Sequence, residues 1–391
     1  MSLNDTPSSE RLQIGFFGRT NAGKSSLVNA LTGQTVALTS PVRGTTTDPV
    51  TKAMEILPLG PVLIIDTPGF DDDSELGERR VARTREILAR VDAAVLVIDA
   101  ALGEGEPEKE LEKLVAERAL PLLKVFNKCD LTGAPADGIF VNSLTGDGIN
   151  ALRDRLAALK PSAPHKTILQ GAVPPGGTAV LVIPIDESAP KGRIILPQQM
   201  VLRELLELGA VAVACRDTEL KDALDRLKSP PDLVITDSQA FRAVNAVVPA
   251  SVPLTSFSIL FARYRGDLDY LVRGAEKLAA LTDSSRVLIS EGCTHHRQCN
   301  DIGTVKLPAL IRRFSGASPV FEFSSGAAFA DDLSRFDLIV HCGGCMLNEN
   351  QMKARLKAAA DAGVPAVNYG VAIAHMTGIL PRALDGLKPK A

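Results

Sequence analysis

Gly18-Arg19-Thr20-Asn21-Ala22-Gly23-Lys24-Ser25 matches in full the phosphate-binding loop pattern G-x-x-x-x-G-K-S. The apolar stretch LQIGFF leads into this loop, and SSLVNALT leads out of it. A strand before the loop and a helix after it form the context in which the pattern binds phosphates. The glycines let backbone N–H groups face the phosphates, and the helix N-terminus adds the positive end of its dipole. The stretch therefore predicts a nucleotide-binding α/β domain.

The residue types in this loop have distinct expected contacts with a nucleotide. Lys24 is expected to reach the β and γ phosphates, and Ser25 to ligate a magnesium ion. The residues predicted to line this part of the site are Gly18, Asn21, Ala22, Gly23, Lys24, Ser25 and Ser26.

Further motifs follow the loop in the order of a guanine-nucleotide domain: Gly44-Thr45-Thr46-Thr47-Asp48, Asp66-Thr67-Pro68-Gly69, Asn127-Lys128-Cys129-Asp130 and Ser143-Leu144-Thr145-Gly146. The first lies where a switch segment supplies a threonine to magnesium. Asp66 places a carboxylate near that ion, and the Gly69 amide lies near the γ-phosphate. Asp130 can accept hydrogen bonds from the ring N–H and the exocyclic amine of guanine, whereas adenine offers the opposite pattern. The base is therefore predicted to be guanine, contacted by Asn127, Lys128, Asp130, Ser143 and Leu144.

Apolar runs alternate with amphipathic segments along the chain, which predicts mostly parallel sheets covered by helices. The first strands are expected at 12–18, 62–66, 93–99, 121–127 and 138–143, and the helices between them at 24–32, 75–90, 107–118 and 149–159. Proline and glycine clusters at 161–166 and 171–177 predict a linker, and two further sets of strands follow it. The predicted fold is α/β with three domains: a P-loop GTPase domain at 1–165 and two smaller parallel-sheet domains at 170–266 and 267–391.

The composition excludes several classes of partner. The 391 residues include 43 Lys and Arg against 46 Asp and Glu, a net charge of -3, which gives no electrostatic attraction for nucleic acid or an anionic membrane. The polar N-terminus predicts neither a signal peptide nor an anchor. The uncharged run Ala243–Ala262 contains two prolines and predicts a loop leading into a strand. We therefore expect a cytoplasmic protein with no nucleic-acid or membrane partner.

Two clusters of cysteine and histidine follow predicted strands. Cys293-Thr294-His295-His296 comes after RVLISEG, and His341-Cys342-Gly343-Gly344-Cys345 comes after DLIV. Because sites form at the carboxyl ends of parallel strands, the two clusters are expected to meet. Their spacing permits a zinc site, an iron–sulfur cluster held by three thiolates and a fourth, non-cysteine ligand, or buried cysteines without a metal. Spacing alone does not separate zinc from iron.

The remaining cysteines and histidines are expected to have ordinary roles. Six cysteines are too few for a disulfide scaffold in a chain of this length. Cys299 and His296 are spare donors beside the first cluster. Packing or surface positions are expected for Cys129, Cys215, His165 and His375.

Residues 10–160 resemble the Era and MnmE group of GTPases, because the motifs above recur in the same order. The resemblance implies that Thr46 is the magnesium-binding switch threonine and that Asn21 helps to hold a potassium ion. It makes Lys24, Thr46 and Gly69 the catalytic set. Phe70 stands where Ras-like proteins carry a glutamine that orients water, so hydrolysis is expected to be slow or assisted by other groups. Phe70 itself has either a packing or a functional role.

The whole chain, including KGRIILPQQ at 191–199, resembles the HydF family of GTPases that mature FeFe-hydrogenase. The resemblance implies a homodimer, with a dimerisation domain at 170–266 and a domain at 267–391 that binds a 4Fe-4S cluster. Cys293, Cys342 and Cys345 correspond to the cluster cysteines, and His295 and His341 to the histidines of the motif. The implied cofactors are GTP/GDP, Mg2+, K+ and the 4Fe-4S cluster.

The same resemblance implies a role as scaffold and carrier. The cargo is the diiron precursor of the hydrogenase H-cluster, and the implied partners are two radical-SAM maturases and apo FeFe-hydrogenase. The alternative from another class is a zinc-stabilised Era-like GTPase acting in ribosome or RNA assembly. The net charge of -3 counts against that alternative.

Overall fold

A computed structural model describes residues 6–33, 50–57, 59–70, 77–129, 138–159, 166–185, 194–292, 301–326, 329 and 332–389. The chain forms two compact units, Met1–Pro164 and His165–Ala391. Each unit is described by itself below. The boundaries expected for three domains stay predictions.

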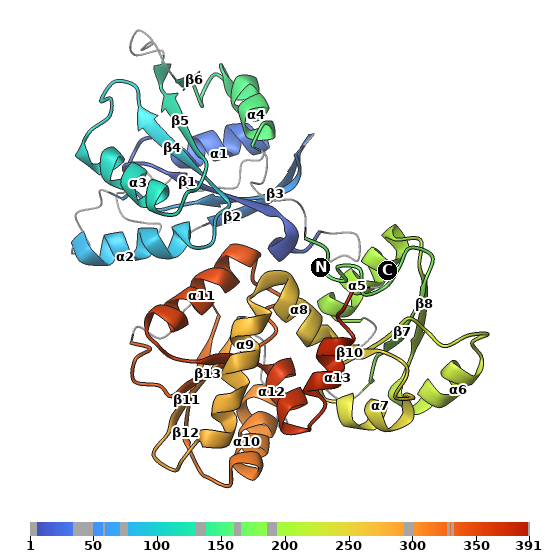
Figure 1. The fold of residues 1–391 in the computed structure, drawn as a ribbon. Coiled ribbons are helices and arrows are strands. Elements are labelled where there is room, and N and C mark those ends of the chain that lie inside the picture. Colours follow the sequence, from blue (N-terminus) through green and yellow to red (C-terminus); the bar gives the residue numbers. More distant parts are fainter. Residues whose placement is uncertain are drawn as a thin grey trace. The chain divides into compact units, whose positions relative to one another are not determined.

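The first unit contains a six-stranded sheet in the order β2-β3-β1-β4-β5-β6 (Figure 1). Its strands are β1 (Leu12–Phe17), β2 (Val50–Ile56), β3 (Gly60–Asp66), β4 (Ala93–Asp99), β5 (Leu122–Asn127) and β6 (Ile139–Val141). Its described helices are η1 (Ser8–Glu10), α1 (Lys24–Thr32), α2 (Gly77–Leu88), α3 (Glu106–Glu117) and α4 (Ile149–Ala157). This is the P-loop α/β domain that the sequence predicts.

The continuous apolar strands of this sheet are buried because helices cover both faces. In β4 every residue from Ala93 to Ile98 is buried. One hydrophobic cluster joins the sheet to α1 and α4, and includes Leu27 and Leu152. The other joins it to α2 and α3, and includes Leu88 and Leu111. The carboxyl ends of the parallel strands therefore lie together at one edge of the sheet, between the two layers of helices.

The strand β2 was missing from the sequence prediction. It pairs antiparallel with β3 at the edge of the sheet, whereas the other neighbouring strands run parallel. Lys52 and Ile56 are buried, while Thr51 and Glu55 are exposed. Only one face of this edge strand is covered, so polar residues interrupt it and it lacks the apolar run that identified the central strands.

The second unit contains two four-stranded parallel sheets, in the orders β10-β9-β7-β8 and β12-β11-β13-β14. The strands are β7 (Thr178–Val182), β8 (Val211–Cys215), β9 (Leu233–Thr236), β10 (Leu254–Ser256), β11 (Arg286–Glu291), β12 (Val320–Ser325), β13 (Leu338–His341) and β14 (Ala366–Asn368). The described helices are α5 (Leu196–Glu207), η3 (Asp217–Glu219), α6 (Leu220–Asp225), α7 (Phe241–Val247), α8 (Phe257–Arg265), α9 (Leu268–Ala275), η4 (Glu276–Ala280), η5 (Ile302–Lys306), α10 (Leu307–Ser315), α11 (Glu349–Asp361), α12 (Tyr369–Met376) and α13 (Leu380–Asp385).

The two sheets of this unit share one hydrophobic core. A single cluster includes Val180 and Val234 from the first sheet together with Val287 and Val340 from the second. The helices α8 and α12 contact each other between the sheets. The shared core explains why the two sheets form one compact unit.

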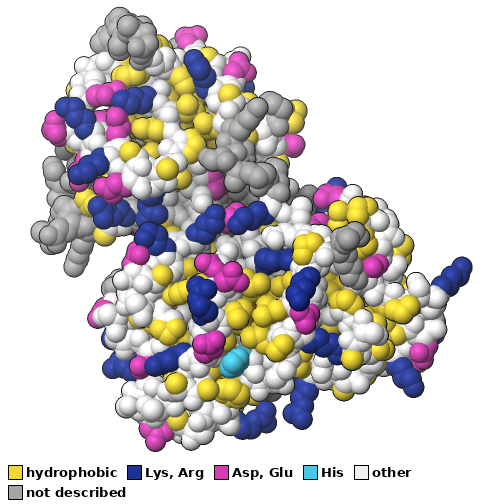
Figure 2. All heavy atoms as spheres, viewed as in Figure 1, with side chains coloured by type: hydrophobic (Ala, Val, Ile, Leu, Met, Phe, Trp, Pro, Cys, Tyr) yellow, Lys and Arg dark blue, Asp and Glu magenta, His cyan; other side chains and the backbone are white. Residues whose placement is uncertain are grey.

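The surface agrees with the near-neutral composition. The face drawn in Figure 2 carries basic and acidic side chains interspersed, as expected for a net charge of -3. Among the residues that the structure describes, no helix has the length and apolar content needed to cross a lipid bilayer.

Gly274 provides a test of the packing between α9 and β14. A Cβ at this position would lie 1.9 Å from the Ala366 carbonyl oxygen, so α9 would have to move away from the strand. We expect Gly274→Ala to lower the free energy of unfolding by about 1–3 kcal/mol, the usual cost of overpacking. Arg273→Ala, at an exposed position of the same helix, is the control. Thermal unfolding measures both, and equal midpoints would contradict the packing described.

Candidate nucleotide and metal sites

The phosphate-binding loop connects β1 to α1 with a backbone that requires glycine. Gly23 has a φ of 88°, and a Cβ there would lie 2.2 Å from the Asn127 side-chain nitrogen. A Cβ on Gly18 would lie 2.3 Å from the Val97 carbonyl oxygen. Lys24 is buried, and its Nζ donates to the carbonyl oxygens of Gly18 at 2.9 Å and Arg19 at 2.8 Å. Its ammonium group therefore lies inside the turn that would surround the phosphates.

Ser25 and Asp66 form the described part of the predicted magnesium site. The Ser25 hydroxyl donates to Asp66 Oδ2 at 2.5 Å. Burial raises the pKa of Asp66, while the Ser25 hydrogen bond and the positive charges of Lys24 and Lys52 act in the opposite direction. The other oxygen, Oδ1, is buried and has no hydrogen-bond partner among the described residues. A buried carboxylate oxygen beside a hydroxyl fits magnesium ligation. Thr46 lies outside the described residues.

The segment after Asp66 contacts the phosphate-binding loop directly. A Cβ on Gly69 would lie 2.3 Å from Thr20 Oγ1, and the Phe70 N–H donates to the Gly18 carbonyl at 3.4 Å. The Phe70 side chain is buried in the hydrophobic cluster that includes Phe17. Phe70 therefore packs in the domain core, which is the packing role expected as one of two alternatives.

Asn127 joins the phosphate-binding loop to the predicted base-binding turn. It is fully buried, its Nδ2 donates to the Ala22 carbonyl at 3.0 Å, and its Oδ1 accepts the Ser143 N–H at 3.1 Å. The next residue, Lys128, forms an ion pair with Asp99 at 2.6 Å. Asp130, the predicted guanine acceptor, lies outside the described residues.

Asn142 shapes the predicted base-binding turn and was missing from the sequence prediction. Its Oδ1 accepts the N–H groups of Leu144 at 2.9 Å and Thr145 at 3.2 Å. This Asx turn leaves the Leu144 side chain 89% exposed, beside Ser143. An asparagine two residues before a predicted turn residue is a sequence signal that could have identified this role.

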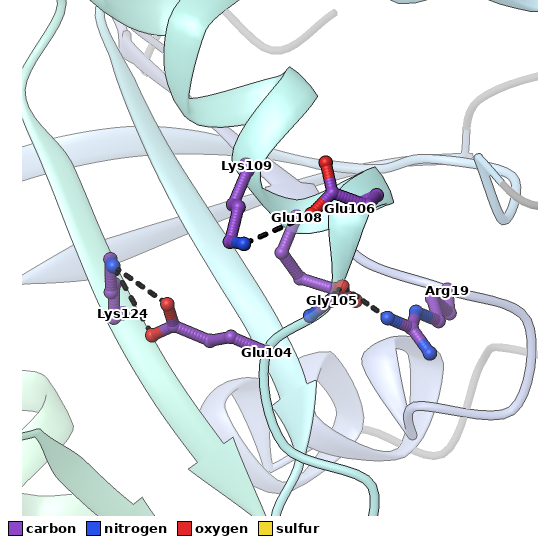
Figure 3. Close-up of polar contacts among 7 residues, drawn as sticks. All are labelled: Arg19, Glu104, Gly105, Glu106, Glu108, Lys109 and Lys124. Atoms are coloured by element: carbon purple, nitrogen blue, oxygen red, sulfur yellow. Dashed lines mark hydrogen bonds and ion pairs between the residues drawn. The ribbon is translucent and has the colours of Figure 1, made fainter.

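Arg19 and Glu108 form an ion pair that the sequence prediction also missed (Figure 3). Glu108 is 1% exposed, and its Oε2 accepts both Arg19 Nη2 at 2.5 Å and the Gly105 N–H at 2.9 Å. The pair therefore ties the phosphate-binding loop to the start of α3. Its members are 89 residues apart in the sequence, so no local pattern indicates it.

The second site begins where β11 and β13 end. These strands pair in parallel with Ser290 opposite His341. The Gly292 N–H donates to Cys342 Sγ at 3.1 Å, and the Cys342 N–H donates to the Ser290 carbonyl at 2.9 Å. The residue that precedes the first cysteine cluster therefore contacts Cys342 of the second. Cys293, His295, His296 and Cys299 lie outside the described residues.

Residues 342–347, here named the cysteine turn, carry two thiols. Cys342 Sγ accepts a second backbone N–H, from Gly344 at 3.4 Å, and burial raises the pKa of this thiol to about 11. Burial also raises the pKa of Cys345, against the positive charge of Arg265. Gly344 has a φ of 64°, which favours glycine. Soft sulfur donors that accept backbone N–H groups fit iron–sulfur ligation.

His341 is held by hydrogen bonds on both ring nitrogens. Nδ1 lies 2.8 Å from the Cys342 carbonyl oxygen, and Nε2 lies 2.8 Å from Arg355 Nη1. Because arginine only donates, Nε2 accepts and Nδ1 carries the proton. Burial and the Arg355 charge lower the pKa of His341 to about 4. This geometry favours a residue that orients the Cys342 backbone, and the ligand role implied by the resemblance stays a prediction.

The described residues alone do not assemble a full metal centre. Within them no group of three or more His, Cys, Asp and Glu side chains is placed to hold a metal ion. Elsewhere, Cys129 and Cys215 are half-buried and His375 packs against Phe314, in the ordinary roles expected for them. His165 lies outside the described residues.

Three family models match the chain in sequence order. Residues 13–128 match the 50S ribosome-binding GTPase family, residues 168–266 the hydrogen maturase F dimerization domain, and residues 269–386 the hydrogen maturase F tetramerization domain. The two maturase domains together span more than half of the chain. The N-terminal domain is a GTPase domain.

Curated relatives match the N-terminal part. The tRNA modification GTPase MnmE of Methylococcus capsulatus is 37% identical over 158 residues, which are 38% of this chain and 34% of that protein. MnmE of Nitrosomonas europaea is 34% identical over 156 residues, with the same shares. The chain thus spans about a third of the length of these relatives. Among solved structures, Aquifex aeolicus Era bound to GDP.AlF4- has 19% identity and a TM-score of 0.34, covering 52% of this chain and 92% of that chain.

The Arg19–Glu108 pair can be tested by nucleotide release. Glu108→Gln removes the charge that holds Arg19, so the phosphate-binding loop should loosen and GDP should dissociate roughly tenfold faster. This effect is smaller than that of breaking a fully buried ion pair, because the Arg19 side chain is partly exposed. Glu106→Gln changes an exposed carboxylate on the same helix and is the control. Stopped-flow release of a fluorescent GDP measures both variants. Equal release rates would exclude a role for the pair.

Proposed function

Because this chain belongs to the hydrogen maturase F family, we propose that it is a GTP-hydrolysing scaffold for hydrogenase maturation. It binds a 4Fe-4S cluster and delivers the diiron precursor of the H-cluster to apo FeFe-hydrogenase. The observation that carries this proposal is that a single chain contains a GTPase domain followed by the two maturase domains. The paired thiols of Cys342 and Cys345 on one turn support the cluster.

The GTPase domain supplies the nucleotide chemistry in this proposal. Lys24 compensates the phosphate charge, and the Gly69 amide faces the γ-phosphate. Ser25, Thr46 and Asp66 hold magnesium, which when bound neutralises charge on the β and γ phosphate oxygens. Asp130 selects guanine. GTP and GDP order the segments around Thr46 and Gly69 differently, so hydrolysis acts as a switch.

The C-terminal part holds the cluster and its cargo. Cys293, Cys342 and Cys345 anchor three irons, and the fourth iron keeps a replaceable ligand, as a carrier requires. His295 and His341 are the candidates for that ligand, with hydrogen bonding to the cluster sulfurs as the alternative role of each. The half-buried Cys342 thiol, with two backbone N–H groups on its sulfur, supports a thiolate ligand, because such donors stabilise its negative charge.

The remaining expectations belong to the same proposal. The protein is a cytoplasmic homodimer formed through the middle domain, and it receives the precursor from two radical-SAM maturases. The zinc-stabilised GTPase of ribosome or RNA assembly is not proposed, because the similarity to MnmE is confined to about 38% of the chain.

Activation of apo-hydrogenase by the precursor-loaded protein tests the proposal. Cys342→Ala should lose most of the iron, because a cluster thiolate is removed, and should no longer activate apo-hydrogenase when loaded with precursor. Cys215→Ala, which removes a half-buried thiol in β8, is the control and should keep both properties. Iron analysis and hydrogen evolution measure the outcome. Retention of iron by Cys342→Ala at the level of the control would overturn the ligand assignment.

The potassium site has its own test. Asn21 is exposed in the phosphate-binding loop, and the buried Phe70 has no group that orients water. In this proposal a monovalent cation beside Asn21 supplies the stabilisation of transition-state charge. Hydrolysis should be faster in potassium than in sodium, and Asn21→Ala should remove the difference. Asn150→Ala, at an exposed position of α4, should retain it. Equal rates for the wild type in the two salts would refute the site.

A further inference from the structure

Arg265 is a buried cation beside the cysteine turn. It is the last residue of α8, and its side chain is 1% exposed. It belongs to the segment that matches the dimerization domain, whereas the cysteine turn belongs to the segment that matches the tetramerization domain. Burial of a guanidinium group is costly unless its donors are satisfied. Its partners therefore indicate what it does.

The guanidinium group binds the backbone of the cysteine turn. Nη1 donates to the carbonyl oxygens of Gly344 at 2.9 Å, Cys345 at 2.8 Å and Leu347 at 2.5 Å. The rings of Phe261 and Tyr264 lie 5.2 Å and 5.7 Å from its central carbon. Three carbonyl groups that converge on one nitrogen fix the path of the chain around Cys345.

The helix that carries Arg265 is itself held in place. Phe257 and Phe261 belong to the core shared by the two sheets. Ala262 packs in a neighbouring cluster with Leu347 and Met352. The end of α8 thus packs against two hydrophobic clusters, so the position of the cysteine turn depends on the middle domain.

We propose that Arg265 is a positioning residue for the cluster thiolate of Cys345, and that it also tunes the cluster. It orders the cysteine turn through the three carbonyl groups. Its buried positive charge favours the reduced, more negative cluster, because net charge nearby is one of the determinants of cluster potential. The inference rests on the proposed function and adds a residue outside the cysteine and histidine motifs.

Arg263 offers a matched control on the same helix. It also donates to three carbonyl groups, those of Leu387, Ile168 and Leu169. None of these belongs to the cysteine turn. Arg263→Met therefore removes an arginine of similar bonding from the same helix without touching the turn.

Hydrogen–deuterium exchange of the cluster-free protein tests the positioning role. In Arg265→Met, peptides covering 342–347 should exchange at least tenfold faster than in the wild type, and in Arg263→Met they should be unchanged. Arg265→Lys should also exchange faster, because an ammonium group does not reproduce the planar guanidinium that lies against the Phe261 and Tyr264 rings. Exchange in both Arg265 variants equal to that in Arg263→Met would overturn the positioning role.

Redox titration of the cluster-loaded protein tests the charge. Arg265→Met should disfavour reduction by about tenfold, or 59 mV for one electron, while Arg265→Lys and Arg263→Met keep the wild-type potential. An unchanged reduction potential in Arg265→Met would overturn the tuning role. If Arg265→Met does not fold, hydrogen–deuterium exchange of Arg265→Lys still decides the positioning role. If the wild-type protein takes up no iron, the proposed function is overturned. The exchange result for the cluster-free protein still holds in that case.

Discussion

The side chain of Asn127 makes the hydrogen bonds on which the nucleotide site depends. Turns after parallel strands carry the chemistry of such folds, but their backbone groups lack the partners that strands and helices provide. Asn127 satisfies the Ala22 carbonyl and the Ser143 N–H together, so it joins the phosphate-binding loop to the turn proposed to bind the base. The Arg19–Glu108 pair adds a second anchor from α3. Two turns distant in sequence thereby become one site.

The cysteine turn is also held by buried side chains from other elements, but here these side chains are charged. Arg265 satisfies carbonyl groups of the turn from α8, and Arg355 fixes His341 at the end of β13. Both arginines are buried, and the positive charge of Arg265 acts on the Cys345 thiol. A site that binds an anionic cluster gains from such a charge. The surroundings of the turn thus support the function proposed from the family.

The sequence predicts the parts of this molecule that local pattern determines. The phosphate-binding loop, the central strands and the helices around them follow from apolar runs and glycine spacing. The antiparallel edge strand at Val50–Ile56 was missed because only one of its faces is covered. Arg265 and Glu108 were missed for a different reason, since their partners lie about 80 to 90 residues away. Contacts of that kind depend on the packing of α8 and α3, which no short pattern specifies.

The central claim is that one chain holds both a guanine nucleotide site and an iron–sulfur cluster. Anaerobic purification followed by metal analysis and electron paramagnetic resonance tests it most directly. We predict a brown protein with about four irons per chain, and a paramagnetic signal after reduction, as for a single 4Fe-4S cluster. A colourless protein with zinc and no iron, without a paramagnetic signal, would contradict the account and favour a structural metal site.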